Sequence, residues 1–181
     1  MPDHKPTELA RLAQEQAGTY TDGRFITLNS VIEEERAEIR LADTLVYIHH
    51  TLRKSVRPSM GASFWRFRAR VAGERPLRIR LVRKTIHQSK LPWHRVFWQF
   101  PEEALRWEQR GPSKIPSQNW TGHRAVQEAL AKTAASQILI KPTPGGTRVE
   151  MHIKGEPTSY AILEQQWNAF LLLMEWVLLA D

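Results

Sequence analysis

The sequence predicts an α+β fold in which a mostly antiparallel sheet packs on two helices. Apolar residues recur at steps of three and four over residues 31–56, which is the spacing of one helical face. Apolar and basic residues alternate one by one within residues 64–86, which is the spacing of a half-exposed strand. Residues 159–179 are apolar on nearly every side, which is typical of a buried helix.

Residues 1–29 are predicted to form a short helix and a loop. The helix is expected near residues 7–17, and Thr21-Asp22-Gly23 is a turn signal within the loop. Residues 30–181 are predicted to form a single α+β domain, which contains a basic segment at residues 61–100.

A long helix is expected over residues 31–56. Ser30 and Glu33 form a capping-box pattern, and the acids that follow Glu33 suit the positive end of a helix dipole. Pro58 ends the helix. His49-His50 lies on this helix, and His49 borders its apolar face, so we expect a core or boundary histidine rather than a metal ligand.

The basic segment is predicted to form a hairpin over residues 64–86, with a loop at Gly73-Glu74-Arg75-Pro76. A third strand is expected near residues 94–100, followed by a short helix that starts at Pro101. The remaining predicted elements are an Ala-rich helix at 122–135, a second hairpin with strands at 136–141 and 147–154, and the apolar helix at 159–179.

The net charge of +7 is concentrated in one part of the chain. Residues 61–100 hold ten basic residues and a single acid, Glu74, whereas the segments on either side are nearly neutral. A focused patch of positive charge is typical of proteins that bind a polyanion.

Alternation places the basic side chains of this segment on one sheet face and the apolar ones on the other. Arginine predominates, and its planar guanidinium suits bidentate phosphate contacts and stacking on bases. The predicted nucleic-acid-binding residues are Arg66, Arg68, Arg70, Arg78, Arg80, Arg83, Lys84 and Arg95, with Phe64 and Phe97 as stacking surfaces.

The sequence therefore favours a non-catalytic protein that binds the backbone of DNA or RNA, as an accessory protein or a subunit of a nucleoprotein assembly. An adaptor module whose basic face meets an acidic partner protein is the alternative, and the acids of residues 33–38 could also pair with these arginines. A third possibility is a metal-independent nuclease that uses His87 or His94.

Several classes of site are not expected. The chain has no cysteine, no phosphate-cradling glycine loop and no histidine spacing typical of a metal site, so we expect no catalytic residue, metal or cofactor. The polar N-terminus has no stretch like a signal peptide, and we expect a cytoplasmic protein without a membrane partner.

The helix at 159–179 is expected either in the core or in an interface. A helix that is apolar all round must be buried, within this chain or against a protein partner or second copy. The predicted interface residues are Trp167, Phe170, Leu171, Met174, Val177 and Leu178.

Residues 31–110 bear a faint resemblance to mobilisation accessory proteins of conjugative elements. The resemblance consists of a helix, an Arg/Trp-rich hairpin and an aromatic strand, in that order, without a specific motif. Integrase arm-binding domains and plant AP2 domains offer an architectural analogy, because they contact DNA with a three-stranded sheet. The second comparison implies a sheet that contacts DNA directly.

Overall fold

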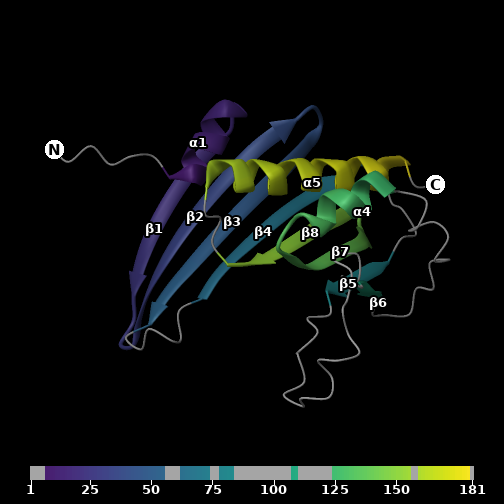
Figure 1. Ribbon diagram of the computed structural model, residues 1–181. Coiled ribbons are helices and arrows are strands. Elements are labelled where there is room, and N and C mark those ends of the chain that lie inside the picture. Colours follow the sequence, from purple (N-terminus) through teal and green to yellow (C-terminus); the bar gives the residue numbers. More distant parts are fainter. Residues whose placement is uncertain are drawn as a thin grey trace, which may run out of the picture.

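The computed structural model of the protein describes residues 7–55, 62–73, 78–83, 107–109, 124–155 and 159–179. Within these ranges every strand belongs to one antiparallel sheet, and the helices lie together on one face of it (Figure 1). The helices are α1 (Glu8–Glu15), α4 (Arg124–Ala131) and α5 (Tyr160–Leu179). The strands are β1 (Thr19–Ile26), β2 (Ser30–Leu41), β3 (Thr44–Ser55), β4 (Ala62–Val71), β5 (Ile79–Arg83), β6 (Trp107–Gln109), β7 (Ala135–Thr143) and β8 (Gly146–Lys154). The predicted α+β class is confirmed.

The predicted long helix over residues 31–56 is wrong, because this segment forms the hairpin of β2 and β3. The two strands pair from Ser30↔Ser55 to Leu41↔Thr44, and the turn between them places Ala42 at a positive φ of 49°. Ala37 and Ile39 alternate with exposed residues, as a half-buried strand requires. The helical spacing seen in the sequence arose because apolar residues of both faces of β3 were counted together: Leu45 lies on one face, and Ile48 and Leu52 lie on the other.

The predicted hairpin over residues 64–86 is wrong in its pairing. Both strands exist, as β4 and β5, but the sheet order is β1-β2-β3-β4-β8-β7-β5-β6, so β8 and β7 lie between them. Strand β8 pairs with β4 from Phe64↔Lys154 to Val71↔Thr147. Alternation in the sequence indicates a strand and its buried face, but not which strand lies beside it.

The other predictions have mixed outcomes. The second hairpin is confirmed as β7 and β8, and the helix at 159–179 is confirmed as α5. Part of the predicted N-terminal loop is strand β1, which pairs with β2. The strand expected near 94–100 lies outside the described residues. Where the helix expected after Pro101 can be checked, Trp107–Gln109 is strand β6 instead.

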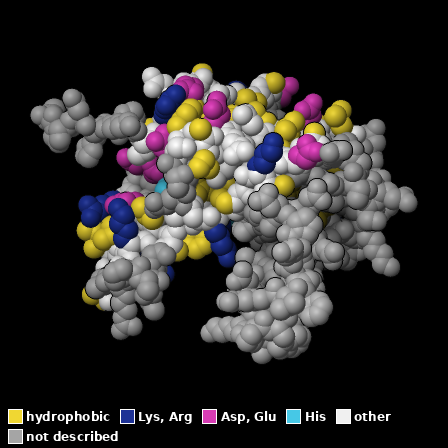
Figure 2. Space-filling view, in the orientation of Figure 1, with side chains coloured by type: hydrophobic (Ala, Val, Ile, Leu, Met, Phe, Trp, Pro, Cys, Tyr) yellow, Lys and Arg dark blue, Asp and Glu magenta, His cyan; other side chains and the backbone are white. Residues whose placement is uncertain are grey.

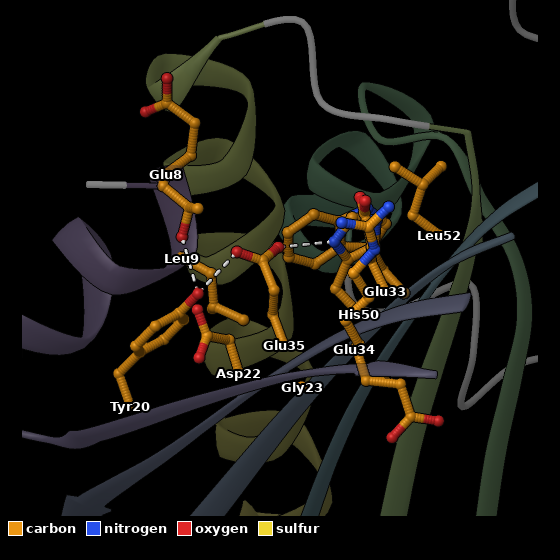
Figure 3. Close-up of a pocket in the computed structure, with 13 residues that line it drawn as sticks. Glu8, Leu9, Tyr20, Asp22, Gly23, Glu33, Glu34, Glu35, His50 and Leu52 are labelled. Carbon is orange, nitrogen blue, oxygen red and sulfur yellow. Dashed lines mark hydrogen bonds and ion pairs between the residues drawn. The ribbon is translucent and has the colours of Figure 1, made fainter. Parts of the chain in front are cut away.

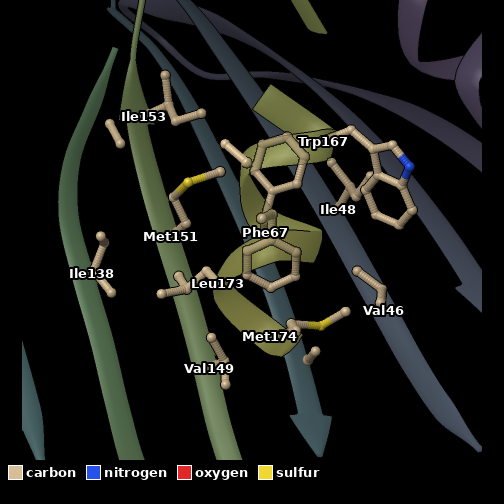
Figure 4. Close-up of a cluster of buried hydrophobic side chains, with 14 of the residues drawn as sticks. Val46, Ile48, Phe67, Ile138, Val149, Met151, Ile153, Trp167, Leu173 and Met174 are labelled. Atoms are coloured by element: carbon tan, nitrogen blue, oxygen red, sulfur yellow. The ribbon is translucent and has the colours of Figure 1, made fainter. Parts of the chain in front are cut away.

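The core lies between the sheet and α5. Buried side chains of β3, β4, β7 and β8 face the helix, and the rings of Phe67 and Phe170 are 5.7 Å apart. Figure 4 shows Trp167 and Leu173 of α5 among these strand residues. Because one sheet face is committed to this core, the opposite face carries the alternate side chains of every strand. None of the helices in the described ranges is both long and apolar enough to cross a membrane.

Candidate nucleic-acid interface

The face of the sheet opposite the helices, called here the open face, carries most of the predicted arginines. On β4 the side chains of Ser63, Trp65, Phe67, Ala69 and Val71 are buried toward the helices. The alternate residues of the same strand are exposed on the open face, and they are Phe64, Arg66, Arg68 and Arg70. No helix within the described ranges lies on this face (Figure 1).

Neighbouring strands add further cations to this face. Lys154 and Arg148 of β8 are cross-strand partners of Phe64 and Arg70, and they therefore share their face. Lys141 of β7 lies opposite Arg148, and Arg80 of β5 lies opposite Leu139 of β7. We call the resulting set the basic face, and its members are Arg66, Arg68, Arg70, Arg80, Lys141, Arg148 and Lys154.

Glu150 is the acid at the centre of the basic face. It is only 6% exposed, and its carboxylate lies 3.1 Å from His152 Nε2 and 3.2 Å from Arg148 Nε. The Arg148 contact is an ion pair by distance, although its N–H is not directed at the oxygen. The hydrogen bond with His152, helped by the charge of Arg148, holds the pKa of Glu150 below its usual range despite the opposing effect of burial. Glu150 thus neutralises part of the positive charge.

Arg70 lies against the turn that joins β7 and β8. A side chain at Gly146 would come within 2.6 Å of the Val71 carbonyl oxygen and 3.2 Å of Arg70 Nε. Gly145, the residue before it, has a positive φ of 74°, and a side chain there would come within 2.9 Å of the Arg70 guanidinium. Because both turn positions lack a side chain, the turn can pass directly beside Arg70.

The acids of residues 33–38 do not neutralise the basic face in the described part of the chain. Glu33 pairs with Lys54 at 2.7 Å, and Glu34 accepts from Arg36 at 2.8 Å. Glu35 lies on the opposite side of the sheet beside His50. Within the described ranges, no ion pair joins an acid to Arg66, Arg70 or Arg80.

A cavity of about 350 Å³ opens on this face between β3, β4, β7 and β8. Three of the residues that line it stand side by side on adjacent strands: Arg66 of β4 is the direct cross-strand partner of His49 on β3 and of His152 on β8. Burial, together with the Arg36 and Arg66 charges, outweighs the attraction of Glu34 and lowers the pKa of His49. The other residues that line the cavity include Phe64, Ser136, Gln137 and Lys154.

Five of the predicted contact residues therefore come together, namely Phe64, Arg66, Arg68, Arg70 and Arg80. Arg78 is exposed immediately before β5. The backbone of Arg83 ends β5, and Lys84, Arg95, Phe97, His87 and His94 lie outside the described residues.

Sequence reasoning missed the contribution of β3, β7 and β8. The missed residues are His49, Lys141, Arg148, His152 and Lys154. The alternation of Arg148 and His152 with apolar neighbours was a usable signal, because it assigns these two side chains to a polar face. The adjacency of β8 to β4 had no signal in the local sequence.

The predicted interface residues of α5 divide between core and surface. Trp167, Phe170, Met174 and Val177 are buried in this chain's own core. Leu171 is half-buried and packs against the core, and Leu178 is 43% exposed. An interface through α5 would therefore involve its exposed side.

A second cavity, of about 660 Å³, lies on the helix side of β1–β4 (Figure 3). His50 stacks on Trp65 there, and its ring nitrogens lie 2.7 Å from Glu35 and 3.0 Å from Ser63 Oγ. Tyr20 donates to the other Glu35 oxygen, and burial raises the pKa of Tyr20 to about 12.

This order of serine, histidine and carboxylate can activate a nucleophile. Ser63, however, is buried away from the cavity and donates its proton to the Gly155 carbonyl. The network therefore satisfies buried polar groups.

The described residues contain no group of three or more acids, histidines or cysteines that could hold a metal ion. No known protein family matches the chain, and no curated protein or solved structure shows significant similarity to it.

Proposed function

We propose that the protein binds the backbone of DNA or RNA through the basic face, as a non-catalytic accessory protein or subunit of a nucleoprotein assembly. The observation that carries the proposal is an imbalance of charge on β4, β5, β7 and β8. Seven cations of these strands lie on the open face with one acid, Glu150. Side chains of like charge repel each other, so this arrangement favours an anionic ligand that spans several strands.

A phosphate backbone fits this surface better than a small anion does. Neighbouring strands are about 4.8 Å apart, so the seven cations extend over several phosphate positions rather than converging on one. Phosphate contacts supply affinity and orientation, whereas sequence readout needs contacts to base edges. We therefore expect weak sequence preference from the basic face alone.

The test is the salt dependence of binding. If about five phosphates are neutralised, the logarithm of the affinity should fall against the logarithm of salt concentration with a slope of about −4 to −5 for duplex DNA. Fluorescence anisotropy with a labelled oligonucleotide measures this slope. An affinity that does not change with salt would contradict the proposal.

A charge-reversed variant locates the contact. Arg66 and Arg80 have no ion-pair partner among the described residues, so Arg66→Glu with Arg80→Glu should leave the fold undisturbed. The salt-dependence slope of this variant should be shallower by the amount that corresponds to about two phosphate contacts. The matched control is Arg24→Glu with Lys132→Glu, which removes the same charge from exposed positions elsewhere. Equal loss in both pairs would show that net charge, not this face, attracts the ligand.

The same variants separate this function from the adaptor alternative. Purification at low salt, followed by the ratio of absorbance at 260 and 280 nm and nuclease digestion, shows whether nucleic acid is retained. Retention by the wild type and its loss in the Arg66/Arg80 pair support nucleic-acid binding. An acidic protein that co-purifies without nucleic acid, and is lost in that pair, supports the adaptor.

A further inference from the structure

We propose that the cavity between β3, β4, β7 and β8 receives one unstacked nucleotide, so that the basic face prefers single-stranded nucleic acid to a duplex. This inference rests on the proposed function. It adds the form of the ligand and the residue on which a base would stack.

The aromatic residues of the open face are the first argument. Phe64 of β4 is 47% exposed and Tyr47 of β3 is 43% exposed, and both face away from the helices. Tyr47 is the cross-strand partner of Arg68, and Phe64 is the partner of Lys154. Each of these two rings therefore lies directly beside a cation, and this pairing suits a ligand with both flat bases and phosphates.

The cavity beside Phe64 is the second argument. Arg66, Lys154, Gln137 and Ser136 all line it. A nucleotide offers matching chemistry, with an anionic phosphate for the cations and a hydrogen-bonding base edge for the amide. The volume of about 350 Å³ lies within the range of about 300–1,000 Å³ for small-ligand sites.

Strand geometry brings these groups within reach of one nucleotide. Phe64 and Arg66 are two residues apart on the same face of β4, which is about 7 Å. His49 and His152 lie on either side of Arg66, about 5 Å away across each strand spacing. A base stacked on Phe64 would leave its phosphate near Arg66, between two further hydrogen-bonding side chains.

A duplex could not use this arrangement fully. Its bases are stacked inside the helix, so Phe64 and Tyr47 would meet only sugars and phosphates. A single strand presents its base faces, and stacking on aromatic side chains stabilises such complexes whatever the sequence. The cavity on the helix side is a poor competing site for an anion, because the carboxylates of Glu8, Asp22, Glu33 and Glu35 line it.

The experiment compares one labelled oligonucleotide, as a single strand and as a blunt duplex, at the same salt concentration. The wild type should bind the single strand more tightly. Phe64→Ala should weaken single-strand binding about 5- to 100-fold and leave duplex binding within about twofold. The separate variant Phe64→Trp should retain single-strand binding, because its larger ring keeps the stacking surface.

Phe25→Ala is the matched control. Phe25 is 55% exposed on β1, and β2 and β3 separate it from β4, so it does not line the cavity. Phe25→Ala should leave both affinities unchanged. Equal binding of single strand and duplex by the wild type, or equal weakening of both by Phe64→Ala, would overturn the inference.

The outcome also distinguishes this inference from the proposed function. If the Arg66/Arg80 variant loses binding to both ligands while Phe64→Ala changes neither affinity, the basic face binds the backbone and the inference of a nucleotide in the cavity is wrong. If the Arg66/Arg80 variant binds both ligands as the wild type does, the proposed function fails with it.

Discussion

Glu150 has the most unusual environment of the charged residues on the open face. It is nearly buried, yet it lies among cations that are exposed to solvent, with Arg68 Nε at 3.7 Å and Arg148 Nε at 3.2 Å. Its carboxylate therefore reduces repulsion between the arginines and also weakens the field that attracts a polyanion. Stability and binding depend on this residue in opposite directions.

Glu150→Gln should tighten nucleic-acid binding and destabilise the fold. Hydrogen bonds to charged groups contribute about 1.5–3 kcal/mol, and chemical denaturation at pH 7 should show a loss of this size in the free energy of unfolding. Because the folded pKa of Glu150 is lowered, its contribution is present above the ordinary carboxyl range and disappears as the pH falls through the folded value. The difference between wild type and variant should disappear with it.

Glu38→Gln is the control for this prediction. Glu38 lies on the open face of β2 and is exposed, so the change in net charge is identical. We expect its free energy of unfolding to stay within about 0.5 kcal/mol of the wild type. A tighter complex with Glu38→Gln, but not with Glu150→Gln, would contradict the central role given to Glu150.

At the scale of elements, β2 and β3 show what the sequence could and could not predict. The apolar residues of β3 fit a helical spacing because Leu45 lies on one face and Ile48 and Leu52 lie on the other, and only the partner strands decide against a helix. One signal was present: the acids Glu33, Glu34 and Glu35 precede the turn and the basic residues His50 and Lys54 follow it, and in the hairpin Glu33 pairs with Lys54 and Glu35 with His50. The basic faces of β4 and β5 followed from alternation, because alternation depends only on local geometry.

Helix α5 should contribute most of its stabilisation through one side. Phe170 is fully buried beside Phe67, so Phe170→Ala should cost about 3–5 kcal/mol in the free energy of unfolding, measured by denaturant titration. Leu172→Ala, two residues further along the helix and 36% exposed, should cost less than about 1.5 kcal/mol. Similar losses in both variants would show that the exposed side of α5 is covered by a partner or a second copy.

At the scale of the whole molecule, the charge on the described surface has two sources. Arg66, Arg68, Arg70 and Arg80 come from the basic segment at 61–100, whereas the other members of the basic face come from the second hairpin. Charge summed along the chain located the first group and missed the second, because the flanks are neutral only on average. Strand pairing in the sheet separates the cations of the flanking segments from the acids of those segments. This long-range pairing cannot be read from the local sequence.

Repulsion between the cations of the basic face should lower the stability of the protein when no ligand is bound. Arg66→Glu with Arg80→Glu should therefore raise Tm at low salt, with a gain of about 0.5–2 kcal/mol in the free energy of unfolding, while it weakens nucleic-acid binding. The Arg24/Lys132 control pair should not raise Tm, because Arg24 lies among the carboxylates of the helix-side cavity and Lys132 lies outside the basic face. In the wild type, a short oligonucleotide should raise Tm beyond the effect of sodium chloride at equal ionic strength.

Thermal unfolding at 20 mM and 500 mM salt measures both effects, and added salt should reduce the gain in stability of the Arg66/Arg80 variant. If the Arg66/Arg80 variant is instead less stable at low salt, these arginines stabilise the fold itself, and the charge of the open face is structural.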